Sequence, residues 1–179
     1  MKKLIIFIMS AVMAVSLTAC GSDTQESSLP EESLVSQEES SAEPEPEPVN
    51  VQEVIDQVYN ELLDGENSSW LREATDEELE KVFGLTEDLC AQVFVRHTML
   101  ITQATRLIGV EAREGQLQAV TDALTATRDE VAAYFQNNNE AQYEITQNAR
   151  IFTNGNYVFL LMCENAEQAE EIVSSFFVE

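Results

Sequence analysis

Six consecutive residues near the C-terminus, Tyr157 to Met162, constrain the fold of this chain more than any other segment. All six are apolar or aromatic, so a strand formed here is apolar on both faces. Such a strand has to be covered on both sides, which is typical of a strand in the middle of a sheet. Asn154-Gly155-Asn156 separates it from a second β-rich run, Ala149 to Thr153. An Asn-Gly pair between two such runs predicts a tight hairpin.

A second pair of strands is predicted earlier in the chain, because 92–99 and 105–112 are rich in Val, Ile and Phe. The residues between them favour a turn, so the pair predicts another antiparallel hairpin.

Helices are predicted around these hairpins by cap residues and by apolar residues at helical spacing. The first begins at Asn50 with Glu53 as its cap and ends at Gly65. The second begins with the capping box of Thr75 and Glu78 and ends at Gly84. A long helix runs from Gly115 to the asparagines 137–139, and the last begins at Asn165 and Gln168.

The predicted order is αα-ββ-α-ββ-α. It indicates an α+β domain, in which an antiparallel four-stranded sheet made of two hairpins packs against helices. Residues 51–179 suffice for one such domain with one core.

The N-terminus carries a targeting signal. Lys2 and Lys3 precede an apolar stretch from 4 to 15, and Leu17-Thr18-Ala19-Cys20 follows. This arrangement resembles the lipobox of bacterial lipoprotein precursors, which implies that 1–19 are a signal peptide and that Cys20 carries a diacylglycerol. We therefore expect a lipid-anchored protein on the extracytoplasmic face of the cell membrane. The alternative is an ordinary secretory signal with an incidental Cys20.

Residues 20–50 form a distinct acidic segment after the lipidated cysteine. From residue 21 onward they hold nine acids and neither Lys nor Arg, and they include the tract Glu43-Pro44-Glu45-Pro46-Glu47-Pro48. Low hydrophobicity with like-charge repulsion predicts a disordered spacer.

The formal net charge of the whole chain is −24, from 9 Lys and Arg against 33 Asp and Glu. Nucleic acids are polyanions and are bound through basic surfaces, so we exclude them as partners.

Catalytic motifs are absent from the sequence. The single histidine, His97, lies among apolar residues of a predicted strand and is expected to pack. No pair of His or Cys residues has the spacing of a metal site, and no glycine loop for phosphate is present, so we expect no cofactor. Acids are plentiful, which leaves an enzyme with paired carboxylates open as an alternative.

Cys90 and Cys163 are the cysteines that stay free when Cys20 is lipidated. One precedes the first predicted strand and the other ends the last strand. In an extracytoplasmic protein they could form a disulfide, and both positions also suit buried thiols.

Three arginines, Arg96, Arg106 and Arg150, fall on or beside predicted strands. Clustered on one face of the sheet, they could bind an anionic group. The alternative is local ion pairing with the surplus acids.

Several motifs together resemble a domain-of-unknown-function family of small lipoproteins from clostridia and related Gram-positive bacteria. They are Val82-Phe83-Gly84-Leu85, Leu89, Ala112-Arg113-Glu114-Gly115-Gln116 and Asn154-Gly155-Asn156-Tyr157-Val158. The resemblance implies the lipobox, the acidic spacer and this order of elements. It implies no activity, and hints at a link to envelope acyltransferases.

These observations favour a membrane-anchored, non-enzymatic binding or accessory module whose partner is an unknown envelope protein or polymer. The alternatives are an enzyme that acts on envelope polymers through paired carboxylates, and an accessory to surface-polymer acylation.

Overall fold

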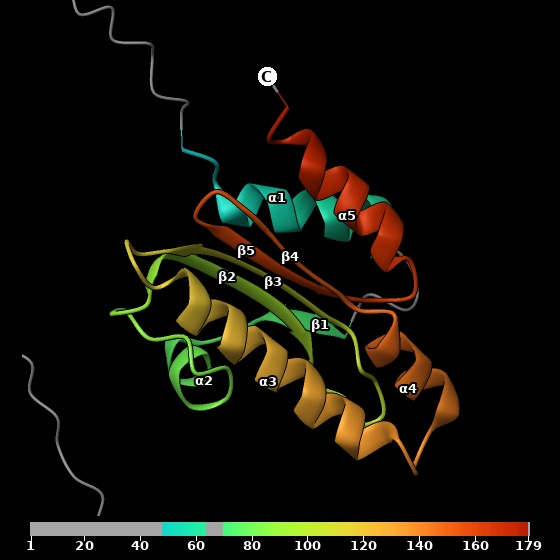
Figure 1. Cartoon of the computed structure of the whole chain (residues 1–179). Coiled ribbons are helices and arrows are strands. Elements are labelled where there is room, and N and C mark those ends of the chain that lie inside the picture. The colour runs from blue at the N-terminus through green and yellow to red at the C-terminus, as the bar shows by residue number, and fades with distance from the viewer. Residues whose placement is uncertain (1–47, 64–69, 179) are drawn as a thin grey trace, which may run out of the picture. The chain divides into compact units, whose positions relative to one another are not determined.

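The structure is a computed structural model that describes residues 48–63 and 70–178 (Figure 1). Four sequence predictions lie outside these ranges: the signal peptide, the lipidation of Cys20, the spacer up to residue 47, and the helix end at Gly65.

The centre of the domain is one antiparallel sheet of five strands within the described residues, in the order β1-β2-β3-β5-β4. The strands are β1 (Leu71–Glu73), β2 (Cys90–Thr98), β3 (Arg106–Ala112), β4 (Arg150–Asn154) and β5 (Tyr157–Met162). The α+β class and both hairpins are confirmed, and β5 lies inside the sheet. The prediction of four strands was wrong, because β1 adds an edge strand that pairs with the end of β2.

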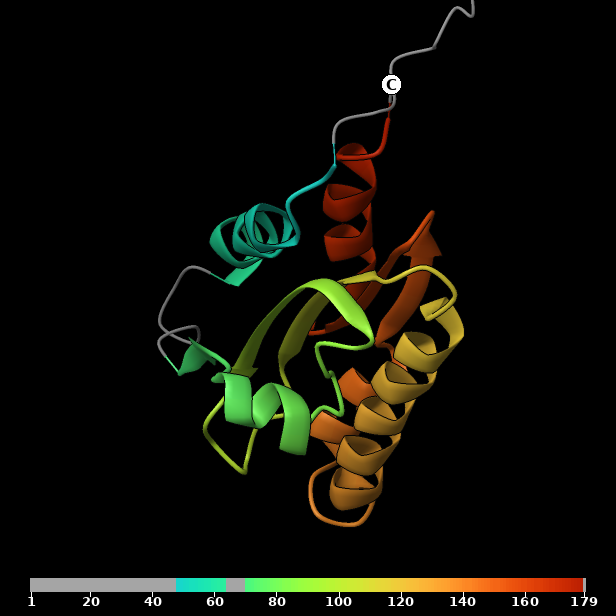
Figure 2. The same cartoon turned by 90° about the vertical axis from the view of Figure 1, so that its left-hand side faces the viewer.

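One face of the sheet is covered by α1 (Val51–Val58), which continues as a π-helical turn η1 (Tyr59–Leu63), and by α5 (Ala166–Ser175). Their apolar residues form one core with side chains of alternate strand positions, such as Phe159 and Leu161 of β5. Figure 2 shows α1 and α5 on the opposite side of the sheet from α2 and α3.

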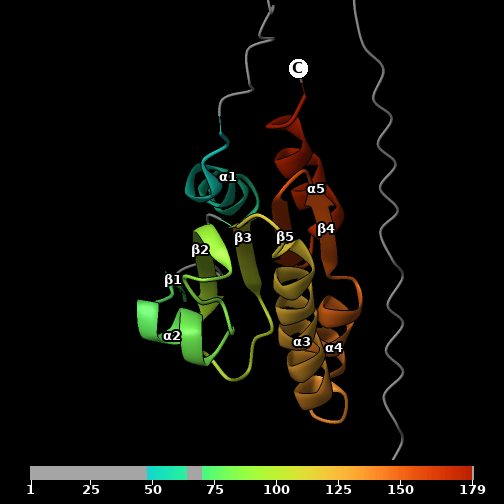
Figure 3. The ribbon, with the colours of Figure 1, turned by 60° about the vertical axis from the view of Figure 1, so that its left-hand side comes forward.

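The other face is covered by α2 (Asp76–Lys81) and α3 (Leu117–Phe135). Here the remaining positions of β5, Val158, Leu160 and Met162, join a second core. A further helix, α4 (Glu140–Gln147), lies beside α3 (Figure 3) and was not predicted. Asn139 was predicted only to end the long helix. It also caps α4, because its side chain accepts from the Gln142 N–H at 3.3 Å.

The predicted caps hold at two of three helices. The Asn50 side chain accepts from the backbone N–H groups of Gln52 and Glu53, and Thr75 forms the full capping box with Glu78. At the last helix the predicted cap position is confirmed at Asn165, but its side chain makes no capping hydrogen bond.

The β4–β5 hairpin turns more tightly than the three-residue motif suggests. Asn154 already pairs with Tyr157, so the turn consists of Gly155 and Asn156. Gly155 adopts a φ of +56°, which a residue with a side chain rarely takes.

The chain enters and leaves the described domain at the same end of the sheet. The Val49 N–H donates to the Tyr157 hydroxyl at 3.0 Å, and the ring of Phe177 lies 5.3 Å from the Tyr157 ring. Tyr157 begins β5, whereas the loop that joins β2 to β3 lies at the other end of the strands.

Candidate functional site

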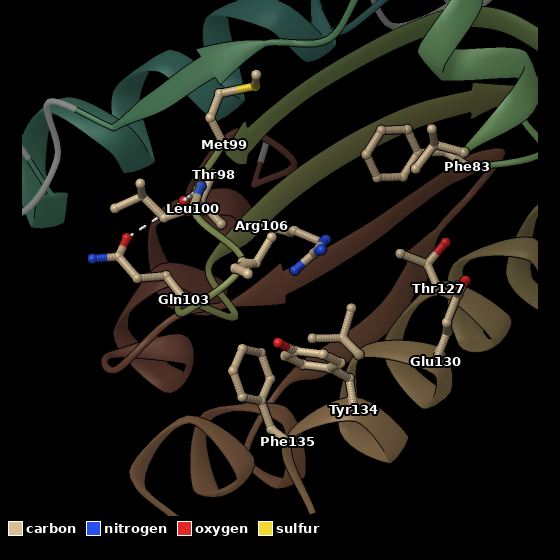
Figure 4. Close-up of a pocket in the computed structure, with 13 residues that line it drawn as sticks. Phe83, Thr98, Met99, Leu100, Gln103, Arg106, Thr127, Glu130, Tyr134 and Phe135 are labelled. Carbon is tan, nitrogen blue, oxygen red and sulfur yellow. Dashed lines mark hydrogen bonds between the residues drawn. The ribbon is translucent and has the colours of Figure 1, made fainter. Parts of the chain in front are cut away.

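A pocket of about 280 Å³ lies between the loop that joins β2 to β3 and the C-terminal half of α3 (Figure 4). Three segments supply its walls. The residues from β2, β3 and their loop are Thr98, Met99, Leu100, Ile101, Gln103 and Arg106. Those from α3 are Thr127, Glu130, Val131, Tyr134 and Phe135, and the residues that follow α2 add Val82 and Phe83. The lining is therefore mostly apolar, with a few polar groups, as is typical of small-ligand sites.

Hydrogen bonds at both ends position the loop of this pocket. At its start the Thr98 hydroxyl accepts from the Leu100 N–H at 3.0 Å, which makes a local turn. At its end the Ala104 N–H donates to the Gln142 side chain of α4 at 2.7 Å. Helix α4, which the sequence did not predict, thus holds in place the loop that forms one wall of the pocket.

Arg106 begins β3, and its guanidinium extends toward α3, between Phe83 and Tyr134 (Figure 4). Its Nη1 donates to the Ala104 carbonyl at 2.9 Å. None of the ion pairs within 48–63 and 70–178 includes Arg106. Burial lowers the pKa of Arg106, and the negative charge of Glu130 partly opposes this effect. An arginine stays charged in proteins, so the pocket contains a positive charge without a carboxylate partner.

Apolar side chains stand exposed around the mouth of this pocket. The exposed fractions are 57% for Val82, 59% for Met99, 77% for Ile101 and 49% for Tyr134. Single exposed apolar residues are ordinary, but these four line one pocket and form its apolar rim, in which the Met99 sulfur also accepts from Arg72 Nε at 2.6 Å.

Behind Phe83 lies a polar cluster of Arg72, Glu78 and His97. Arg72 pairs with Glu78 through both carboxylate oxygens. The hydrogen bond from Arg72, and then the one from the Thr75 N–H, lower the pKa of Glu78 to about 2. Glu78 is therefore a permanently ionised structural carboxylate at neutral pH.

His97 is buried against Phe83, with ring centroids 5.3 Å apart. Its Nε2 lies 3.8 Å from Glu78 Oε2 and makes no hydrogen bond within the described part of the chain. Burial lowers the pKa of His97, and the positive charges of Arg72 and Arg106 lower it further, against a raising effect of Glu78. His97 is thus a neutral packing residue at pH 7.

The structure does not bring Arg96, Arg106 and Arg150 together, which excludes the cluster and leaves the alternative of local ion pairing for two of them. In the sheet register Arg96 and Arg150 share the row of Leu107 and Leu161 on the α1–α5 face. Arg106 pairs across the strands with His97 and points to the opposite face.

The two arginines of the α1–α5 face also have acidic partners. Arg96 donates to Asp56 of α1 at 2.7 and 2.8 Å, and Arg150 lies 3.5 Å from Glu170 of α5. Of the three, Arg106 alone keeps a guanidinium without a carboxylate partner among the described residues.

Of the two alternatives for Cys90 and Cys163, a disulfide or buried thiols, the structure shows buried thiols. Both are free thiols, and they lie in different cores on opposite faces of the sheet. Burial raises the pKa of each thiol to about 11, so both are unreactive at neutral pH.

Two kinds of feature are absent from residues 48–63 and 70–178. No group of three or more His, Cys, Asp or Glu side chains there could hold a metal ion, and no helix there is long and apolar enough to cross a membrane.

The sequence predictions missed the pocket, although two signals pointed to it. Met99-Leu100-Ile101 is an apolar run in a turn between two strands, where polar residues are expected. Tyr134 lies outside the apolar stripe of the long helix that ends with Val131 and Phe135.

Comparison with protein families gives one match, to a domain of unknown function (DUF4358), over residues 64–163. This range contains the whole sheet and every residue of the pocket. Neither the curated proteins nor the solved structures give a match. The match covers more than half of the chain, and the chain therefore belongs to the DUF4358 family.

Proposed function

We propose that this chain is a lipid-anchored protein of the extracytoplasmic membrane face, and that its DUF4358 domain is a non-enzymatic binding module. Its ligand site is the pocket between the β2–β3 loop and α3. The observation that carries the proposal is Arg106, a half-buried guanidinium without a carboxylate partner in a mostly apolar pocket. Arg72 and Arg96, by contrast, pair with acids of the helices that cover the sheet.

The exposed apolar rim supports the same proposal. Val82, Met99 and Ile101 remain in water in the free protein, which is unfavourable by roughly 25 cal/mol for each Å² of apolar surface. A bound ligand would remove this surface from water. The volume of about 280 Å³ suits a small molecule or one small group of a larger partner.

The position of the pocket suits a tethered receptor. The segment from Cys20 joins the domain at Val49, beside Tyr157, and Tyr157 pairs with Glu111 at the end of β3. Arg106 begins that strand, about 17 Å away at roughly 3.3 Å per residue. The pocket thus lies at the opposite end of β3 from Val49, where the tether joins the domain.

The alternative of a carboxylate enzyme gains no support from Glu78. General acid catalysis at neutral pH needs a carboxyl group whose pKa is raised toward 7, and the pKa of Glu78 is lowered to about 2.

The pocket is tested by ¹H–¹⁵N spectra of the chain that begins at Gly21. This chain keeps both cores, since all their residues lie between Val49 and Phe177. A mixed set of small anionic, cationic and neutral fragments is added. We expect shifts of amide signals that cluster at Met99, Leu100 and Tyr134. Shifts scattered over the surface, or none with any fragment, would contradict the binding site.

The anchor is tested by metabolic labelling with a radioactive fatty acid in a bacterial host that processes lipoproteins. The full chain should take up label, and the Cys20→Ala variant should take up none and stay unprocessed. Equal label in both proteins would refute lipidation at Cys20.

A further inference from the structure

We propose that the pocket takes a small amphipathic carboxylate, with the carboxylate on Arg106 and an apolar body against the β2–β3 loop and Tyr134. This inference rests on the proposed function, because it names the class of ligand for the same site.

The choice of an anionic head comes from Arg106. A guanidinium donates through five N–H groups in a planar fork, and in the described structure the Ala104 carbonyl is its one acceptor. The remaining donors on the side of α3 match the two oxygens of a carboxylate. Four of the six described arginines, Arg72, Arg96, Arg128 and Arg150, pair with acids. Arg113 also lacks a carboxylate partner and donates to the Glu87 carbonyl, but it does not line this pocket.

The choice of an apolar body comes from the residues around that head. Phe83, Val131 and Phe135 form the buried walls, and Met99, Ile101 and Tyr134 form the exposed rim. A ligand that consisted of a charge alone would leave these surfaces in contact with water. An alkyl or aryl body covers them and gains the corresponding hydrophobic free energy.

The choice of a single charge comes from Glu130, the one acid that lines the pocket. It is exposed and lies beyond ion-pair distance of Arg106, so it leaves the guanidinium donors open. Its negative charge disfavours a second negative charge on the ligand. A monovalent carboxylate satisfies Arg106 with less of this repulsion than a dianionic phosphate or a polyanion.

The experiment measures binding of four probes to the chain that begins at Gly21, by titration followed in ¹H–¹⁵N spectra. Octanoate carries both the charge and the apolar body. Acetate carries only the charge, 1-octanol only the body, and octylammonium the body with the opposite charge. We expect octanoate to bind at least about tenfold more tightly than each of the other three, with shifts at Met99 and Tyr134.

Three variants assign the selectivity to Arg106. Arg106→Gln should weaken octanoate at least about tenfold and leave 1-octanol unchanged, because only the charged contact is lost. Arg106→Lys should retain part of the preference, since the charge stays. Arg128→Gln is the matched control on α3, because Arg128 pairs with Asp129 and does not line the pocket. The dispersion of the amide signals shows whether each variant is folded.

The outcomes separate this inference from the proposed function. If octanoate, octylammonium and 1-octanol bind equally at the pocket, or if Arg106→Gln and Arg128→Gln bind octanoate alike, the carboxylate class is wrong and the pocket remains a binding site. If no probe binds, the carboxylate class is again wrong. The binding module itself fails only if the fragment set also gives no clustered shifts.

Discussion

At the scale of single residues, a shift of one residue along a strand places an arginine on the other face of the sheet, beside different partners. Arg96 and His97 are neighbours on β2 and point to opposite faces. Arg96 meets Asp56 of α1, whereas Arg106, opposite His97, enters the pocket. The sequence predicts which residues lie on strands, but it does not give the register between β2 and β3 or the acid that each helix presents. The three-arginine cluster failed for that reason.

His97 predicts a pH dependence of stability with a definite sign. Its pKa in the folded state is lowered by burial and by Arg72 and Arg106, and Glu78 raises it only in part. The unfolded chain therefore binds a proton near pH 6.5 that the folded chain does not bind. The free energy of unfolding should fall from pH 7.5 to 5.5, by at most about 1.4 kcal/mol. Urea unfolding at the two pH values measures it.

The chain has one histidine, so the effect can be assigned. In His97→Phe, which keeps a ring against Phe83, the difference between pH 7.5 and 5.5 should shrink to the small remainder due to carboxylates. The same difference in both proteins would contradict the assignment. An NMR titration of His97 with a midpoint at or above 6.5 would contradict it independently.

At the scale of elements, the sequence predicted the strands, turns and caps that depend on neighbouring residues. The two-sided apolar run of β5, the two hairpins and the caps at Asn50 and Thr75 all follow from residues close in the chain. The structure added β1 and α4, whose signals are weak. β1 has three residues and exists through its pairing with β2, and α4 has eight residues with only Ile145 and Thr146 buried. Both depend on tertiary contacts that no local pattern reports.

A side chain at Gly109 of β3 would meet α1, so a substitution there tests how closely α1 packs on the sheet. A Cβ at this position would lie 3.1 Å from Ile55 Cγ1 and 3.1 Å from Phe159 Cε1. Both neighbours are fully buried and cannot move away without disturbing the core. Gly109→Ala should therefore lower the free energy of unfolding by about 1–3 kcal/mol. Urea unfolding measures the change.

A double-mutant cycle with Ile55→Ala checks the cause. The second variant removes Cγ1, so Gly109→Ala should cost less in its presence than in the wild-type background. A stabilising Gly109→Ala, or an equal cost in both backgrounds, would show that α1 does not restrict this position.

At the scale of the whole molecule, the prediction of a domain of unknown function is confirmed by the family match, which ends at Cys163. The lipoprotein features stay predictions.

The matched range holds the sheet, the pocket and the helices α2, α3 and α4, and it leaves out α1 and α5. Those two helices nevertheless complete the core on the α1–α5 face of the sheet, with Val54, Ile55 and Val173 fully buried. The folding unit of this chain is therefore larger than the range that the family match covers.

The N-terminal boundary of that unit gives the last prediction. The sequence placed the boundary at residue 51, and the structure adds contacts of Val49. Its N–H donates to Tyr157 Oη at 3.0 Å, its carbonyl accepts from Gln92 Nε2 at 3.3 Å, and its side chain packs on the core of the α1–α5 face. A chain that begins at Pro48 should unfold at the same urea concentration as one that begins at Gly21. A chain that begins at Asn50 should lose about 1–3 kcal/mol of unfolding free energy.

A point substitution separates these contacts from the effect of moving the charged terminus next to α1. Tyr157→Phe, in the chain that begins at Gly21, removes the acceptor of the Val49 N–H and keeps the ring that packs on Phe177. It should cost about 0.5–1.5 kcal/mol, a part of the loss in the Asn50 chain. If the Pro48 chain is less stable than the Gly21 chain, residues 21–47 stabilise the domain and are more than a spacer. If the Asn50 chain matches both, Val49 contributes nothing and the boundary stays where the sequence put it.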